Sequence, residues 1–108
     1  FPLFLENINN FGIKNVVPIV NESSYVAEKW NSPLAMVFID GGHSFETAMN
    51  DFMSWHKKII SGGALVIHDI FENPDEGGQA PYEVYMHALK NGFSDYERFD
   101  TIVCLEKA

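Results

Sequence analysis

Two carboxylates and two histidines stand directly after two apolar stretches of this chain. Asp40 and His43 follow the apolar run 34–39, and His68 and Asp69 follow a second, shorter run. Carboxylate oxygens bind hard divalent cations, and an imidazole can accept a proton or coordinate a metal ion. These four residues are therefore the candidates for chemistry, provided that the fold brings the two stretches together.

The segment between the two apolar runs predicts how they are arranged. Ser44 can cap a helix, and apolar residues then recur on one helical face as far as Ile60. Gly62 and Gly63 are expected to end this helix before a buried strand over 64–67. Strand, helix and strand in this order predict a parallel crossover, so both strands end at one edge of the sheet. Open α/β sheets bind their ligands at that edge.

The position of each candidate along its strand separates the four further. Successive side chains of a strand point to opposite faces, so His68 is expected to face away from Asp69 and to be structural. Asp40 and Asp69 are then the natural pair for a cation such as Mg²⁺, with no third protein ligand evident. His43 is either a general base or a loop histidine bonded to the backbone.

The remaining segments predict a single α/β domain over residues 1–108. Pro18 would place a strand over 16–20 at the edge of the sheet, whereas the apolar segment 101–107 suits its interior. Loop 71–80, rich in Gly, Pro and acidic residues, is either a lid or a solvated loop. We expect a mostly parallel sheet with an antiparallel end. Helices are expected over about 1–10, 24–30 and 81–91, and strands over 16–20, 34–39, 64–67, 93–99 and 101–107.

Composition and charge exclude several classes of partner. The net charge is −8 and no basic run occurs, which makes nucleic acid or an anionic membrane an unexpected partner. No window is long and apolar enough for a membrane span or a signal peptide. The single cysteine, Cys104, is expected in the core, so a reduced, cytoplasmic setting is the expectation. Because the chain starts at Phe1 and not at Met, we expect a piece of a longer polypeptide.

The segment FIDGGHSFETAMNDFMSWHKKIISGGALVIHDI, residues 38–70, resembles the fourth and fifth strands of class I S-adenosylmethionine-dependent methyltransferases. It is most similar to the bacterial branch with an IDGxHxY…W…L..GG…HD pattern, which includes sugar and antibiotic-tailoring O-methyltransferases. Phe45 stands where that pattern usually has Tyr. The segment VVPIVNESS is similar to the third strand of the family and its acidic end. The resemblance implies a Rossmann-like sheet, S-adenosylmethionine as the cofactor and a small molecule as the methyl acceptor.

The resemblance also implies roles for individual residues. Asp40 would lie near the sulfonium and the acceptor, and it is a cation ligand in metal-dependent relatives, with Asp69 as the second ligand. Glu22, Asp40 and Gly41 would contact the cofactor. His43 and Asp40 would be the catalytic residues.

One departure from the family pattern changes the expectation for the chain. No GxGxG-like segment is present, and the strand ending in the ribose-binding acid is also absent. The resemblance therefore implies the C-terminal portion of a methyltransferase domain, with the N-terminal strands missing. In the family's strand order, 3-2-1-4-5-7-6, the missing strands separate the third from the fourth. A homodimer that covers the exposed edges is therefore a hypothesis.

Two other functions stay open at this point. One is a metal-dependent hydrolase using Asp40, His43, His68 and Asp69, although a zinc or two-metal site would need more ligands than the sequence offers. The other is a non-catalytic α/β module kept for dimerisation or binding, which the absent glycine loop favours for the chain as given.

Overall fold

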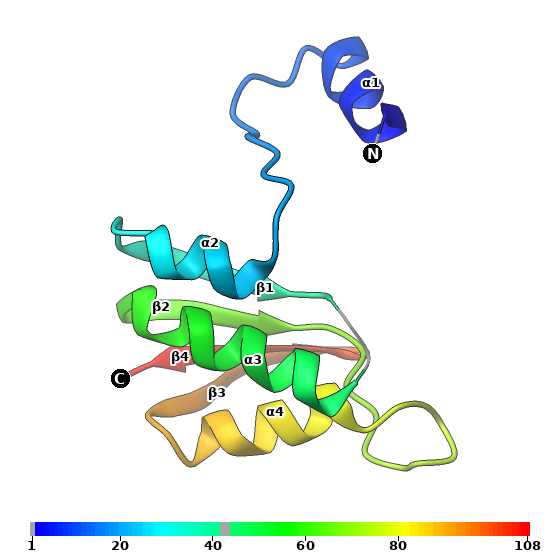
Figure 1. The fold of residues 1–108 in the computed structure, drawn as a ribbon. Helices are drawn as coiled ribbons and strands as arrows, with labels where there is room; N and C mark the ends of the chain where they lie inside the picture. Colours follow the sequence, from blue (N-terminus) through cyan, green and yellow to red (C-terminus); the bar gives the residue numbers. More distant parts are fainter. Residues whose placement is uncertain (1, 42–43) are drawn as a thin grey trace.

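The computed structural model describes residues 2–41 and 44–108; two helices come first, strands and helices then alternate, and two strands come last (Figure 1). The α/β class predicted from the sequence is confirmed. No described helix is long and apolar enough to cross a bilayer. In order, the elements are α1 (Pro2–Asn10), α2 (Ser23–Lys29), β1 (Leu34–Ile39), α3 (Phe45–Trp55), the 3₁₀ turn η1 (His56–Lys58), β2 (Ile59–Ile67), α4 (Ala80–Leu89), β3 (Phe93–Phe99) and β4 (Ile102–Lys107).

The four described strands form one mixed sheet in the order β1-β2-β4-β3. β1 and β2 run parallel, which confirms the predicted crossover through α3. The apolar strand β4 lies inside the sheet and pairs antiparallel with both β2 and β3. The expectation of a mostly parallel sheet is therefore wrong for the described strands, because one pair is parallel and two are antiparallel.

The boundary between α3 and β2 differs from the prediction. The helix ends at Trp55, and Ile59 already pairs with Leu34 of β1. The two glycines lie inside β2 and not after a helix. The register shifts between the pairs Leu34–Ile59 and Met36–Ala64, so residues 60–63 bulge from the ladder. Positive φ angles are common both at helix ends and at bulges, so the glycine pair indicated a break in regular structure without showing which kind.

Segment 16–20 does not form the predicted edge strand. Its residues are exposed, and the backbone has no strand partner among the described residues. Figure 1 shows this segment leading from α2 to α1, which lies away from the sheet. Apolar β-branched residues favour a strand only when a neighbouring strand is there to accept their hydrogen bonds.

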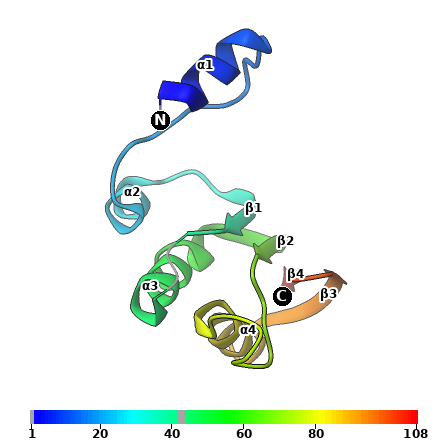
Figure 2. The same cartoon turned by 90° about the vertical axis from the view of Figure 1, so that its right-hand side faces the viewer.

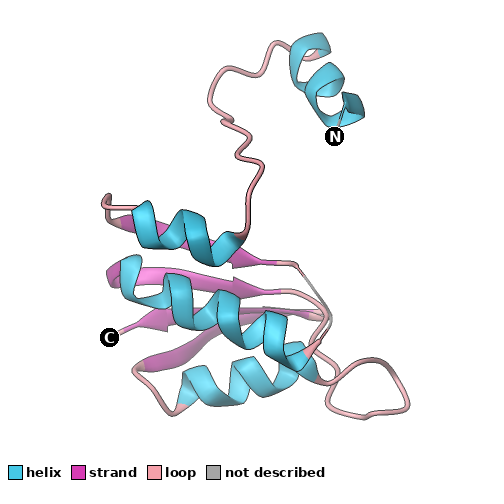
Figure 3. Cartoon of the chain, viewed as in Figure 1, coloured by secondary structure: helices cyan, strands magenta, loops and turns pink. Residues whose placement is uncertain are grey.

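Helices α2, α3 and α4 cover one face of the sheet (Figures 2 and 3). Val37 and Ile39 of β1 point to this covered face, whereas Met36 and Phe38 alternate to the other face and are about half exposed. The largest fully buried side chains define the core: Phe52, Leu65, Ile67, Ile70, Val84, Val103 and Leu105.

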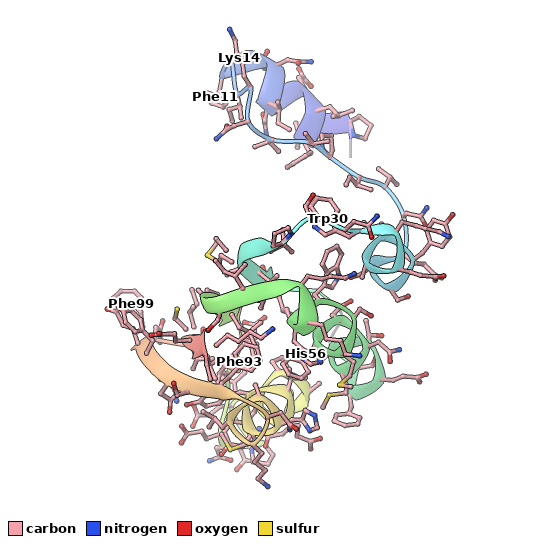
Figure 4. All side chains as sticks on the ribbon, turned by 90° about the vertical axis from the view of Figure 1, so that its left-hand side faces the viewer. Phe11, Lys14, Trp30, His56, Phe93 and Phe99 are labelled. Atoms are coloured by element: carbon pink, nitrogen blue, oxygen red, sulfur yellow. The ribbon has the colours of Figure 1, made fainter. Side chains whose placement is uncertain are left out.

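Aromatic residues hold the helices together beneath the sheet. The ring of Phe52 stacks on His56, with centroids 4.7 Å apart, and Phe93 lies 6.5 Å from His56 (Figure 4). The Nε2 atom of His56 is buried without a hydrogen-bond partner. Trp55 donates its indole N–H to the Ser23 hydroxyl at 2.7 Å, which links α3 to α2.

Polar contacts tie β3 to the covered face and to loop 71–79. Tyr85 donates its hydroxyl to Asp95, and burial together with this bond raises the pKa of Tyr85 to about 12. Arg98 pairs with Glu72 of the loop at 2.7 Å. Asp95 is exposed, and its carboxylate accepts the bond from the buried Tyr85.

Candidate functional site

Asp40, His68 and Asp69 meet at the carboxyl ends of β1 and β2. The Nδ1 atom of His68 lies 3.0 Å from Asp40 Oδ1 and 3.6 Å from Asp69 Oδ1. One donor atom from each residue lies within 4.8 Å of the other two. All three side chains are partly open to solvent. The predicted meeting of two strand ends is therefore confirmed for these residues.

Backbone hydrogen bonds on either side of His68 and Asp69 fix the position of these two residues. Ile39 and Ile67 are the last paired residues of β1 and β2, and the His68 amide donates to the Ile39 carbonyl at 3.3 Å. Two residues later, the Ile70 amide donates to the Thr101 carbonyl at 2.9 Å, and Ile70 is buried. The His68–Asp69 pair is therefore held between two fixed points of the sheet.

The prediction that His68 faces away from Asp69 is wrong. It assumed that strand alternation continues to Asp69, but β2 ends at Ile67. Asp69 has a φ of 62°, in the left-handed region. That turn breaks the alternation and brings both side chains toward Asp40. Aspartate tolerates this conformation better than most residues, so the sequence allows the turn without demanding it.

The carboxylates set the protonation of the histidine. The hydrogen bond with Asp40 raises the pKa of His68; desolvation opposes it, and the charges of Asp69 and Asp40 add to the rise. In the protonated state the imidazolium pairs with these carboxylates. In the neutral state the Nδ1–H tautomer still donates to Asp40, which orients the imidazole for proton transfer, whereas the other tautomer would offer Nδ1 with the two carboxylates to a divalent cation.

Two of the three donor spacings are close to those around one metal ion. An octahedral ion with ligands at about 2.1 Å holds adjacent donors about 3.0 Å apart and opposite donors about 4.2 Å apart. The two distances from His68 Nδ1, 3.0 and 3.6 Å, are close to the adjacent separation. The expected Asp40 and Asp69 pair is therefore brought together, with a nitrogen donor beside it.

A cavity of about 500 Å³ opens beside Asp40 and Gly41, between β1, α2 and α3. Its apolar lining includes Trp30 and Trp55, and Asp51 borders it. A Cβ atom at Gly41 would lie 3.0 Å from Asp51 Oδ2, so the glycine gives this carboxylate room. Ligand sites in proteins commonly have about 300–1,000 Å³ and a mostly apolar lining, which this cavity shares.

Glu22 lies apart from the Asp40 cluster. It precedes α2, and its side chain makes no capping bond. It borders a second hollow of about 410 Å³, whose lining also includes Asn50 and Asp51. Asp51 borders both hollows, yet it sits mid-helix without a motif, so no sequence signal singled it out. His43 lies outside the described residues, and its predicted role stays a prediction.

The sheet order β1-β2-β4-β3 corresponds to strands 4-5-7-6 of the order that the sequence resemblance implied. The family described as "Methyltransferase domain" matches residues 4–70. This match spans more than half of the chain, and the chain therefore belongs to the methyltransferase domain family.

Solved structures share the fold at low sequence identity. SMU.1697c from Streptococcus mutans, described as a methyltransferase and solved with SAH, is 15% identical with a TM-score of 0.64, over 96% of this chain and 68% of its own. A Staphylococcus aureus protein described as a caffeoyl-CoA O-methyltransferase is 13% identical with a TM-score of 0.71, over 96% of this chain and 57% of its own.

A third structure was solved with a metal ion. MycE, a methyltransferase of the mycinamycin biosynthetic pathway in complex with Mg and SAH, is 21% identical with a TM-score of 0.55. The match covers 80% of this chain and 28% of MycE. Two further matches are described as rRNA methylases. The chain thus spans only part of the length of these proteins.

Proposed function

We propose that this chain is part of an S-adenosylmethionine-dependent methyltransferase, namely the part whose strand ends form the catalytic site. We propose that the enzyme methylates a hydroxyl group of a small molecule. The observation that carries the proposal is the position of Asp40, which directly follows β1 at the rim of the 500 Å³ cavity in a chain of the methyltransferase domain family. Gly41 borders the same cavity, and Glu22 borders the neighbouring hollow. These three residues are the proposed cofactor contacts.

Methyl transfer to a hydroxyl group requires the enzyme to position the reactants more than to form a covalent bond with them. Bound S-adenosylmethionine would supply a methyl group already activated on a sulfonium, for transfer from its sulfur to the acceptor oxygen. The acceptor hydroxyl loses its proton in the same reaction. Asp40, at the cavity rim, is proposed to hold that hydroxyl in line, and His43, three residues later in the sequence, is proposed to accept the proton.

Asp40 and Asp69 are also the proposed ligands of a divalent cation. Such an ion would lower the pKa of the acceptor hydroxyl and so ease loss of its proton. The spacing of the cluster supports this part of the proposal, as does the magnesium ion in the MycE structure. A hydrolase would need more ligands, and the described residues offer only Asp40, His68 and Asp69 as a possible metal cluster.

A small acceptor is proposed in preference to RNA because the chain carries a net charge of −8. Proteins that bind RNA neutralise phosphates with lysine and arginine, and this chain has 7 such residues against 15 acidic ones. Structural similarity to rRNA methylases at this level of sequence identity shows a shared fold. It does not indicate that RNA is the methyl acceptor of this chain.

The test is transfer of a labelled methyl group from S-adenosylmethionine to a panel of sugars, catechols and other small hydroxylated compounds, with RNA as a separate arm. Asp40→Asn should lower the transfer rate by about a hundredfold, the size of effect that follows when a reacting group is held out of position. Asp75→Asn, a change in the exposed loop, is the matched control and should leave the rate unchanged. Equal rates for both variants, or transfer to RNA alone, would contradict the proposal.

A further inference from the structure

We infer that helix α1 of one chain packs on the uncovered face of the sheet of a second copy, so that two chains exchange their N-terminal arms. The arm is residues 2–20, which comprise α1 and the segment that follows it. The open face is the side of the sheet opposite α2, α3 and α4 (Figure 2). This contact concerns the assembly of the chain and does not depend on the proposed methyl transfer.

The open face is apolar across three neighbouring strands. Phe38 of β1 pairs with Val66 of β2, and Val66 pairs with Cys104 of β4, so these three side chains form one row. Two residues before Phe38, Met36 lies opposite Ala64 on the same face. Met36 is 58% exposed and Phe38 is 48% exposed. Strands that are apolar on both sides are typical of sheets covered on both faces, and no described helix covers this one.

The arm carries apolar side chains that its own chain leaves in solvent. No residue of α1 is buried, and Leu5 and Ile8 lie three residues apart on one side of it. Four large apolar side chains of the arm are each more than two-thirds exposed: Leu3, Phe11, Val17 and Val20. With nine residues α1 is about 14 Å long, and it therefore fits along a strand of six residues, which is about 20 Å long.

The segment between α1 and α2 favours a second copy over the chain's own sheet. It leads α1 away from the sheet in both views (Figures 1 and 2). Pro18 fixes its own φ and favours an extended conformation at Val17. To reach its own open face, the arm would have to fold back around β1, the strand at that edge of the sheet. Exchange of identical arms between two copies needs no such turn and is a low-cost route to a dimer.

The distribution of charge also favours the arm as the contact. Residues 1–20 contain one acidic and one basic residue, so the net charge of −8 lies entirely on residues 21–108. Two such acidic bodies repel each other when their sheets approach directly, whereas a neutral arm can cover an acidic partner. The strand register places Glu97 and Glu106 on the open face, where Lys14 of an incoming arm would supply the opposite charge.

The size of the exchanged parts fits a stable dimer. A standard interface uses about 20–30 residues on each side. Each chain would contribute both its arm and the open face of its sheet, so the two copies form the same contact twice. One arm on one face would be a small interface, and the reciprocal exchange doubles it.

Sedimentation equilibrium of the 108-residue chain tests the contact. We expect a wild-type dimer, and Met36→Glu on the face and Ile8→Glu on the arm should each raise its dissociation constant by about tenfold or more. Each change places a charge in an apolar contact. The matched control is Met53→Glu, a methionine of α3 that is 47% exposed, and it should stay within about twofold of the wild type. Far-UV circular dichroism verifies that each variant is folded.

Paramagnetic broadening in NMR then identifies whose arm covers the face. Chains with a nitroxide on Asn10→Cys are mixed with ¹⁵N-labelled chains that carry no nitroxide, both in a Cys104→Ala background. We expect broadened amide signals of Met36 and Val66 in the ¹⁵N-labelled chains, and unchanged signals of α4.

Three results would overturn the inference. A wild-type chain that stays monomeric forms no exchange. Broadening of the face signals that occurs only when nitroxide and ¹⁵N are on one chain would show that the arm covers its own sheet. A dimer in which the face signals are not broadened, or in which Met53→Glu weakens association as much as Met36→Glu, would place the contact elsewhere.

Discussion

Replacing Gly63 by alanine is expected to destabilise the sheet that carries the site. A Cβ atom there would lie 2.9 Å from the carbonyl oxygens of both Ala35 and Ile60, and 2.6 Å from a methyl group of Ile59. Ordinary contacts begin at 3.4 Å, so two backbone oxygens would each have to retreat by about half an ångström. Ile59 is 2% exposed and has little room to turn away.

The size of the effect follows from what must move. Ala35 belongs to β1, so its displacement strains the adjacent Met36–Ala64 pairing, which leads toward Asp40 and His68. Overpacking in a well-packed region costs about 1–3 kcal/mol, and contacts with backbone place Gly63→Ala near the upper end, at about 3 kcal/mol. For a domain of this size that corresponds to a fall in Tm of roughly 10–20 °C.

Urea unfolding followed by circular dichroism measures this change, with two other glycines as matched controls. Gly62 has a φ of +80° and open space around its Cβ position, so Gly62→Ala should cost only the strain of the left-handed conformation, about 1–2 kcal/mol. Gly78 has open space and no left-handed φ, so Gly78→Ala should change the free energy of unfolding by less than about 0.5 kcal/mol. A loss below 0.5 kcal/mol for Gly63→Ala would refute the packing argument.

Three further predictions concern other parts of the fold. Burial and nearby lysine charges lower the pKa of His56 in the folded chain. As the pH falls, the unfolded chain therefore protonates this histidine at a higher pH than the folded chain does. The free energy of unfolding should then fall as the pH drops below about 6.5. His56→Phe should show a smaller loss between pH 7.5 and 5.5, and an equal loss would count against this account. Tyr85→Phe removes the bond to Asp95 and should cost about 1 kcal/mol in urea unfolding, with the exposed Tyr96→Phe near zero. We also propose that a second copy pairs with β1, the strand at one edge of the sheet: sedimentation should show a dimer, and a wild-type monomer would exclude it.

The sequence predicted the central strand, helix and strand because local signals agreed there. A continuous apolar run, a serine that caps α3 and a one-sided helical face all indicated the same unit, and Ser44 does accept the Thr47 amide. The topology then predicted that Asp40 and Asp69 lie close together. A parallel crossover brings the ends of both strands to one edge of the sheet, whatever the conformation of the loops. Such agreement between local and global signals is what makes a segment predictable.

The errors came from features that depend on distant partners. Segment 16–20 has strand composition, but it has no strand beside it among the described residues. The orientation of His68 relative to Asp69 depends on the left-handed φ of Asp69. Aspartate tolerates this conformation, but no sequence pattern predicts it. Asp51 borders the cavity next to Gly41, whose missing Cβ leaves room for the Asp51 carboxylate. Each of these is set by tertiary structure and not by spacing along the chain.

Titration of the ¹⁵N-labelled chain with S-adenosylhomocysteine, followed by NMR, tests the central claim most directly. If the cavity beside β1 is a cofactor site, micromolar binding should shift the amide signals of Asp40, Gly41 and Asp51 while those of the distant β3 residues stay in place. A spectrum that does not change up to millimolar ligand, or shifts confined to β3, would contradict the assignment of a cofactor site to this chain.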